Sequence, residues 1–251
     1  MLAAQRRDLL LARLRTDGRI VAKELAEETG VSEDSVRRDL RELAAAGLCQ
    51  RVYGGALPVS PALGDYAMRT GVEPASKQRV AARAAALVLP GSTVVLDGGT
   101  TTLAVARALP PDLRATVVTH SPTVAAALVE HPTVEIYLLG GRVFKHSAVA
   151  CGAAAVQAAA DVNADLFLLG VTGVHARAGL TTGDSDEAAM KRALARRAAD
   201  TYVLASVEKL GTAAPFRVLD LDEVAGVVTD APEDTPTLTE LAELGVQVLH
   251  A

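Results

Sequence analysis

The sequence predicts an α/β protein with two domains, an N-terminal winged helix-turn-helix and a C-terminal open α/β sheet domain. Residues 1–58 contain three helical patterns followed by a hairpin signal. Residues 59–73 are interrupted by prolines and glycines and indicate a linker, whereas short apolar runs alternate with helical stretches across residues 74–251. A chain of 251 residues is long enough for two modest domains.

Composition limits the kinds of site that the chain can carry. Only 3% of the residues are aromatic, so sites built from stacked rings are disfavoured. No apolar run approaches the roughly 18 residues that cross a bilayer, and Arg6, Arg7 and Asp8 stand where a signal peptide would be apolar. We therefore expect a cytoplasmic protein without a membrane partner. Two distant cysteines, Cys49 and Cys151, and five scattered histidines predict neither a disulfide framework nor a metal site, and we expect no cofactor.

The first 46 residues have the pattern of a helix-turn-helix. A first apolar stripe ends at the Asp17-Gly18 turn, and a second, short helix covers 22–29 and stops at Gly30. Ser32 is then expected to cap a third helix over 33–46. Two helices joined by a short turn that contains glycine are typical of this DNA-binding motif.

The third helix is predicted to bury one face and to expose a basic one. At 100° per residue, Val36, Leu40 and Leu43 share one arc. The opposite arc carries Asp34, Arg38 and Arg41, and Arg37 lies at its edge. A basic helix face that stood alone would usually be only solvated surface. Here it is followed by residues 48–53, a Gly54-Gly55 turn and residues 56–57, which predict a β-hairpin wing.

The order of cap, glycine turn, buried stripe, basic face and hairpin predicts a domain that binds double-stranded operator DNA. Residues 1–58 carry nearly balanced charges, so binding depends on where the arginines point rather than on net charge. The expected DNA contacts are Ser32, Asp34, Ser35, Arg37, Arg38, Arg41, Arg51, Tyr53 and Gly54.

Strands that alternate with helices predict a mostly parallel sheet covered on both faces. The expected strands are 93–96, 116–118, 134–139, 166–169, 202–204, 224–228 and 246–249. The expected helices are 76–89, 101–109, 123–130, 152–162, 187–199 and 238–244. Ligands of such sheets bind beyond the carboxyl ends of the strands, where this sequence places glycines and small hydroxyl residues.

The segment Asp97-Gly98-Gly99-Thr100-Thr101-Thr102, which follows the first strand, is the most informative of these ends. Its glycines permit close approach of a ligand, and its threonines lead into a helix whose N-terminus favours an anion. An equally open alternative is that Thr101 or Thr102 simply caps the helix. The chain has neither G-x-x-x-x-G-K-[ST] nor G-x-G-x-x-G, so a small phosphorylated molecule is favoured over a nucleotide. Asp97 could accept hydrogen bonds from sugar hydroxyls.

The expected effector site gathers residues from several strand ends. Lys209, just after the fifth strand, is placed to reach a phosphate. Lys191 and Arg192 are more simply explained as solvated helix residues. The expected site comprises Asp97, Gly98, Gly99, Thr100, Thr101, Thr102, Thr119, His120, Gly140, Gly141, Gly170, Gly173 and Lys209, with Arg69, Lys77, Arg142, Lys145, Glu187 and Lys191 as further polar candidates.

Residues 31–40, Gly47 and residues 51–56 resemble the DNA-binding half of the DeoR family of bacterial transcription regulators. The rest resembles the sensor half of that family at Arg69, Lys77, 97–102, Thr119, Gly140-Gly141, Gly152, Asp165, Gly170, Gly173, 179–181, Lys209, Gly211 and Thr229-Asp230. The resemblance implies a sensor fold similar to ribose-5-phosphate isomerase, phosphorylated sugars as inducers and a repressor of a sugar-utilisation operon. We expect two or more copies to act together, as a dimer or tetramer.

Two alternatives and three departures qualify that resemblance. A sugar-phosphate isomerase with an appended DNA-binding domain is the first alternative, but the Asp-Gly-Ala-Asp stretch of the isomerases reads Leu169-Gly170-Val171-Thr172 here, so both carboxylates that could shuttle a proton are absent. A structural DNA-binding protein without a ligand is disfavoured by the glycine-rich strand ends. The departures from the family pattern are Tyr53, His120 and Ser206.

Overall fold

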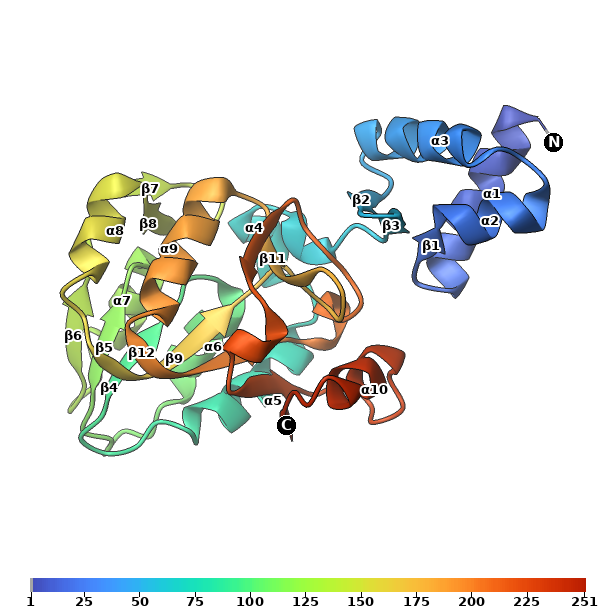
Figure 1. Cartoon of the computed structure of the whole chain (residues 1–251). Helices are drawn as coiled ribbons and strands as arrows, with labels where there is room; N and C mark the ends of the chain where they lie inside the picture. Colours follow the sequence, from blue (N-terminus) through green and yellow to red (C-terminus); the bar gives the residue numbers. More distant parts are fainter. Residues whose placement is uncertain (1) are drawn as a thin grey trace.

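The computed structural model describes residues 2–251, and Figure 1 shows a small helical part at the N-terminus beside a larger part built on a sheet. The predicted combination of a winged helix-turn-helix with an open parallel α/β sheet is confirmed. Among the described residues, no helix is long and apolar enough to span a membrane.

The N-terminal part contains the three predicted helices. They are α1 (Ala3–Thr16), α2 (Ala22–Thr29) and α3 (Glu33–Ala45). The stripe of Val36, Leu40 and Leu43 is buried against Leu10 and Leu14 of α1. The buried face of α3 is therefore the one that its periodicity predicts.

The wing is a three-stranded sheet in which β3 (Gly55–Leu57) lies between β1 (Ile20–Val21) and β2 (Gln50–Val52). The turn is Tyr53-Gly54 rather than the predicted Gly54-Gly55, since Val52 pairs with Gly55. A Cβ on Gly55 would lie 1.7 Å from the carbonyl oxygen of Ile20, so β1 can approach β3 only at a glycine. Because β1 has two residues, no periodicity could predict it.

A buried ion pair holds α3 on α1. Asp39 is almost fully buried on α3 and accepts a hydrogen bond from Arg6, with Arg7 Nε 3.7 Å away. The apolar stripe and this pair together orient α3. The exposed face of α3 is therefore presented in one direction.

Residues 59–73, which we call the cover segment, lie against the larger part, whereas the sequence indicates only a linker. The cover segment contains the 3₁₀ turn η1 (Pro61–Leu63) and the short helix α4 (Tyr66–Thr70). Ser60 Oγ donates to the carbonyl oxygen of Thr172 at 2.6 Å, and the amide of Tyr66 donates to the carbonyl oxygen of His146 at 2.8 Å. The helix in the segment has five residues, too few to show a helical period in the sequence.

The larger part is a seven-stranded sheet whose neighbouring strands all pair in parallel, in the order β15-β14-β12-β9-β4-β5-β6. All seven predicted strands are present. They are β4 (Thr93–Leu96), β5 (Thr116–Thr119), β6 (Glu135–Leu138), β9 (Ala164–Gly170), β12 (Ala198–Leu204), β14 (Gly226–Thr229) and β15 (Val248–His250).

Helices cover both faces of this sheet (Figure 1). On β9, Leu166 and Leu168 enter one apolar cluster while Phe167 and Leu169 enter the other, as alternation along a strand requires. The first cluster packs α5 (Pro74–Ala85), α6 (Thr100–Ala108) and α7 (Pro122–Leu128). The second packs α8 (Ala153–Ala159), α9 (Ser185–Ala195) and α10 (Pro236–Glu243).

Two small antiparallel sheets, absent from the sequence prediction, flank the carboxyl edge of the main sheet. One pairs β7 (Arg142–Phe144) with β8 (Val149–Cys151), and the other has the order β10-β11-β13. The latter strands are β10 (Gly173–His175), β11 (Gly179–Thr182) and β13 (Phe216–Leu219). These strands do not alternate with helices, and that alternation is the pattern that predicted the main sheet. The predicted helix 187–199 also runs too far, since α9 ends at Ala195 and β12 begins at Ala198.

Candidate effector cavity and nucleic-acid interface

A small cavity lies at the carboxyl ends of β4 and β9, where the N-terminus of α6 meets the cover segment. Four cationic and two acidic side chains line it, so it carries a net positive charge. Its lining residues are Ala62, Arg69, Lys77, Gly98, Gly99, Thr100, Thr101, Thr102, Gly170, Val171, Thr172, Thr182, Glu187, Lys191, Glu208 and Lys209.

The N-terminus of α6 opens into this cavity without a side-chain cap. Gly99 is the N-cap residue at φ +123°, a conformation that favours glycine, and it has no side chain to bind the amides of the first turn. Thr102 Oγ1 instead donates to the carbonyl oxygen of Gly99 at 3.0 Å. Gly98 is equally constrained, because its Cβ would lie 2.0 Å from Cγ1 of Val149. The alternative of a threonine cap is therefore wrong, and the first-turn amides can receive an anion.

Lys209 and Arg69 are cations that lie beside that N-terminus. Lys209 Nζ donates to Thr101 Oγ1 at 3.3 Å and to the carbonyl oxygen of Leu204 at 3.2 Å. Both acceptors are neutral, and burial lowers the pKa of Lys209 to about 8. A Cβ built on Gly99 would lie 3.9 Å from Nη1 of Arg69, so the guanidinium group lies close to the N-cap residue of α6. Burial lowers the pKa of Arg69 as well.

Lys77 ties the cover segment to α5. Its ammonium group is buried and donates to the carbonyl oxygens of Arg69, at 2.6 Å, and Val72. Burial lowers the pKa of Lys77, and the nearby Glu208 opposes that effect. These contacts hold the end of α4 over the cavity, which places Arg69 opposite the N-terminus of α6.

Asp97 does not face the cavity, contrary to its predicted role as an acceptor for sugar hydroxyls. It is completely buried, and Oδ2 accepts from the amide of Gly170 at 2.9 Å and from Lys191 Nζ at 2.5 Å. Oδ1 lies 2.8 Å from His120 Nε2. Burial alone would raise the pKa of Asp97, but Lys191 and His120 hold it well below its usual range. Asp97 is thus an internal counter-ion with both oxygens engaged.

The prediction that Lys191 is solvated is wrong. Only 3% of Lys191 is exposed, and its ammonium group bonds Asp97 and, at 3.0 Å, the carbonyl oxygen of Gly170. Helical spacing could not reveal that this position of α9 faces a buried carboxylate from another strand. Arg192, also expected to be solvated, is half-buried and donates to the carbonyl oxygen of Arg217 at 2.5 Å.

The structure brings about half of the expected effector residues together. Those that line the cavity are Gly98, Gly99, Thr100, Thr101, Thr102, Gly170 and Lys209. Those outside it are Asp97, Thr119, His120, Gly140, Gly141 and Gly173. Gly140 and Gly141 follow β6, which is two strands removed from β4, and Gly173 in β10 packs against the carbonyl group of Thr212. Of the further candidates, Arg69, Lys77, Glu187 and Lys191 line the cavity, whereas Arg142 and Lys145 are exposed elsewhere.

Sequence reasoning missed Glu208 and the walls formed by Ala62, Val171, Thr172 and Thr182. The acidic Glu208 stands in an apparent phosphate-binding stretch beside Lys209, which gives no signal of a ligand contact. Ala62 lies in η1 and Thr182 in β11, two short elements that were not predicted, whereas Val171 and Thr172 follow the predicted strand β9. Their place in the site follows only from the tertiary arrangement.

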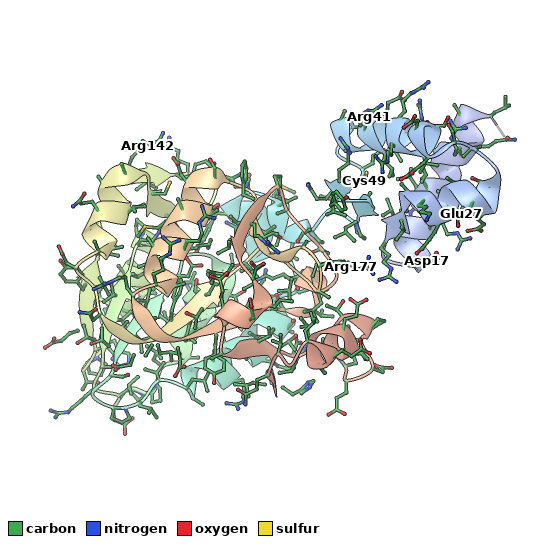
Figure 2. All side chains as sticks on the ribbon, viewed as in Figure 1. Asp17, Glu27, Arg41, Cys49, Arg142 and Arg177 are labelled. Atoms are coloured by element: carbon green, nitrogen blue, oxygen red, sulfur yellow. The ribbon has the colours of Figure 1, made fainter. Side chains whose placement is uncertain are left out.

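The expected DNA contacts form one exposed surface on α3 and the wing. Ser32 caps α3 through the amide of Ser35 at 3.3 Å, and Asp34, Arg38 and Arg41 are exposed. In Figure 2, Arg41 projects from the outer side of α3. A groove between the helix and the wing is lined in part by Arg37, Leu40, Arg51, Tyr53 and Gly54. Arg37 also pairs with Glu33 one turn earlier, at 2.6 Å. Tyr53 is fully exposed at the wing tip.

Comparison with known families now decides what these two parts are. A model described as the DeoR-like helix-turn-helix domain matches residues 6–62, and one described as the DeoR C terminal sensor domain matches residues 72–231. The chain belongs to the DeoR family of transcriptional regulators. The resemblance seen in its sequence is thereby confirmed.

Two curated relatives span nearly the whole DeoR-family chain. The HTH-type transcriptional regulator GlpR of Haloferax volcanii is 34% identical over 236 residues, which cover 93% of this chain and 92% of that protein. The Glycerol-3-phosphate regulon repressor of Escherichia coli K12 is 29% identical over 249 residues, which cover 99% of each chain. Among solved structures, ribose 5-phosphate isomerase A of Methanocaldococcus jannaschii matches 53% of each chain with 18% identity and a TM-score of 0.40.

This DeoR-family protein is a DNA-binding transcriptional regulator with a sensor domain. The relatives are named as regulators and repressors, so the alternative of a sugar-phosphate isomerase with an added DNA-binding domain is not favoured.

Proposed function

We propose that the protein represses a sugar-metabolism operon and leaves its operator when a phosphorylated sugar occupies the cavity. The cationic cavity at the uncapped N-terminus of α6 carries this proposal. The cavity has the positive charge and the backbone donors that a phosphate requires. The other domain of the chain exposes the arginines that would bind DNA. The names of the curated relatives, which include a repressor of a glycerol-3-phosphate regulon, support the same reading.

On DNA, α3 would lie in the major groove. Arg38 and Arg41 are exposed and would contact base edges or phosphates, while Arg37 and Arg51 line the groove beside the wing and would contact phosphates. Ser32, Ser35, Asp34, Tyr53 and Gly54 complete the surface. A homo-oligomer, dimer or tetramer, would place two such helices in successive major grooves of an operator.

The cover segment gives the cavity a direct connection to the wing. It supplies Ala62 and Arg69 to the cavity wall, and only Pro58 separates it from Leu57 at the end of β3. A phosphate that binds Arg69 therefore acts on the segment that joins the two domains. The salt bridge between Arg19 and Glu240 that also joins them is exposed and weak. An effector releases DNA only if it favours a domain orientation that binds DNA poorly.

Operator binding by the full chain tests the proposal. A DNA site is first selected from random sequences by binding to the protein. Gel shifts at fixed salt then measure the affinity for this site with and without a panel of triose, pentose and hexose phosphates. We expect at least one of them to release the DNA and to raise the melting temperature. Absence of any response to the panel would contradict the sensor role. Conversion of the bound sugar phosphate, followed by NMR, would favour the isomerase alternative.

A further inference from the structure

Two residues of the cavity wall each have a buried polar atom without a hydrogen-bond partner in the described chain. These atoms are Oε2 of Glu208 and Nε of Arg69, and both residues line the cavity. A buried polar atom without a partner costs about 1–3 kcal/mol, and native structures contain few of them. An acceptor and a donor left open in one cavity indicate a ligand that offers the matching groups.

The carboxylate of Glu208 is held so that one oxygen is engaged and the other is open. Glu208 belongs to the 3₁₀ turn η2 (Val207–Lys209), and its Oε1 accepts from Ser206 Oγ at 2.7 Å. Ser206 is completely buried, so this anchor is not exchanged for water. The unpaired oxygen Oε2 therefore has a defined position on a residue of the cavity wall.

Glu208 also lies close to the cations that would bind the phosphate. Burial lowers the pKa of Lys209, and the charge of Glu208 opposes this effect, as it does for Lys77. A carboxylate in that position repels a phosphate oxygen. It can only accept, so it requires a hydroxyl or amino group of the ligand.

We propose that Glu208 determines effector specificity by accepting a hydrogen bond from a hydroxyl or amino group of a phosphate monoester whose phosphate lies at α6, Lys209 and Arg69. This inference rests on the proposed function. It assigns to Glu208 the role of accepting hydrogen bonds from ligand hydroxyls, which the sequence suggested for Asp97. It defines the ligand class as a small phosphorylated polyol, sugar or amino sugar. Inorganic phosphate and phosphate esters that present a carboxylate at Glu208 are disfavoured.

The test is the ratio between the affinity for a sugar phosphate and the affinity for inorganic phosphate. Calorimetry on the full chain would compare the wild type with Glu208→Gln, which keeps the shape of the side chain and removes its charge. Inorganic phosphate should bind the variant as well or better, because a negative charge leaves the site. The best sugar phosphate should lose its advantage over phosphate by about tenfold, since a charged acceptor is lost. Exposed Glu243→Gln on α10 is the matched control and should leave the ratio unchanged.

A second variant keeps the inference testable if Glu208→Gln does not fold. Ser206→Ala frees the carboxylate without removing it, so the same ratio should fall by about threefold. An amino-sugar phosphate should lose more affinity in Glu208→Gln than its hydroxyl counterpart if the ligand group is an ammonium, and no more if it is a hydroxyl.

The failures of the two proposals are distinguishable. A wild type that binds inorganic phosphate but gains nothing from any hydroxylated or amino phosphate ester overturns the role of Glu208 and leaves the anion site in place. A ratio that stays within twofold in both variants also overturns it. A wild type that binds neither phosphate nor any ester overturns the sensor proposal as well.

Discussion

The exposed basic face of α3 and the cationic wall of the cavity use the same chemistry in opposite environments. Arg38 and Arg41 stand in solvent, whereas Lys77, Lys191 and Lys209 are each at least 95% buried. Burial lowers the pKa of Lys209 to about 8, a cost that solvated arginines do not incur. The DNA surface can therefore act through many weak, screened contacts, while the cavity acts through few strong ones.

The largest expected difference between the two sites is their response to salt. Eight arginines in a dimer, four from each copy, would release counter-ions from DNA, so operator affinity should fall about ten-thousandfold between 50 and 200 mM salt. Affinity for the sugar phosphate should change only a few-fold, because buried charges are screened less. Calorimetry and gel shifts over the same salt series measure both. An equal salt dependence of operator affinity and sugar-phosphate affinity would contradict this difference between the two sites.

Replacement of the buried cation comes next in size. Lys209→Met should weaken sugar-phosphate binding about a hundredfold, because a buried charge partner of the phosphate is lost. The same variant should be more stable without ligand at pH 7, by about 3 kcal/mol, since the unfavourable burial of the ammonium disappears. Chemical denaturation checks the second effect. A variant that is both stable and still induced would contradict the cavity assignment.

The same cation gives stability a pH dependence. The unfolded chain keeps the proton of Lys209 up to the ordinary value of 10.5, whereas the folded chain releases it near 8. The cost of burial is therefore fully present below pH 8 and is relieved as the pH rises from 8 towards 10.5. Lys209→Met should flatten this part of the stability profile.

On the DNA side, Arg38→Ala should weaken operator binding about tenfold and leave the fold unchanged, because Arg38 is exposed and an arginine–guanine pair is worth about 1–3 kcal/mol. Gel shifts at fixed salt measure the loss, and circular dichroism checks the fold. Thr101→Arg is the complementary variant, since it fills the cavity and should abolish induction while DNA binding remains. Unchanged operator affinity in Arg38→Ala would remove α3 from the interface.

The smallest expected effect is a pH dependence confined to the cavity. Sugar-phosphate affinity should fall about fourfold between pH 7 and 8.5, because Lys209 loses its charge as the pH passes about 8. Operator affinity of the ligand-free protein should stay constant over this range, since arginines remain charged. A pH response of operator binding equal to that of the cavity would show that the two sites are not chemically separate.

The sequence predicted what depends on local pattern. The stripe of Val36, Leu40 and Leu43 gave the orientation of α3, and the apolar runs gave all seven strands of the main sheet. The glycines before α6 and the threonines of its first turn predicted the helix N-terminus that lines the cavity, because both are local features of the sequence. These are the parts of the site that one continuous segment supplies.

What the sequence could not predict depends on contacts between distant segments. Asp97 looked like a ligand contact because it ends a strand, but Lys191 from α9 and His120 from the end of β5 enclose it. Lys191 looked solvated because the sequence does not show that α9 places its ammonium group against Asp97. Glu208 is a candidate ligand contact because it is hydrogen-bonded to Ser206 and has an unpaired oxygen. Neither feature can be recognised in the sequence.

The cover segment has a practical consequence for dividing the protein. A truncated sensor that started at Pro74, the first residue of α5, would lack Ala62 and Arg69 and thus one wall of the cavity. It would also leave the acceptor carbonyl of Thr172 without Ser60. A fragment that contains the metabolite-sensing domain should therefore begin before Val59, so that it includes the cover segment that packs against this domain.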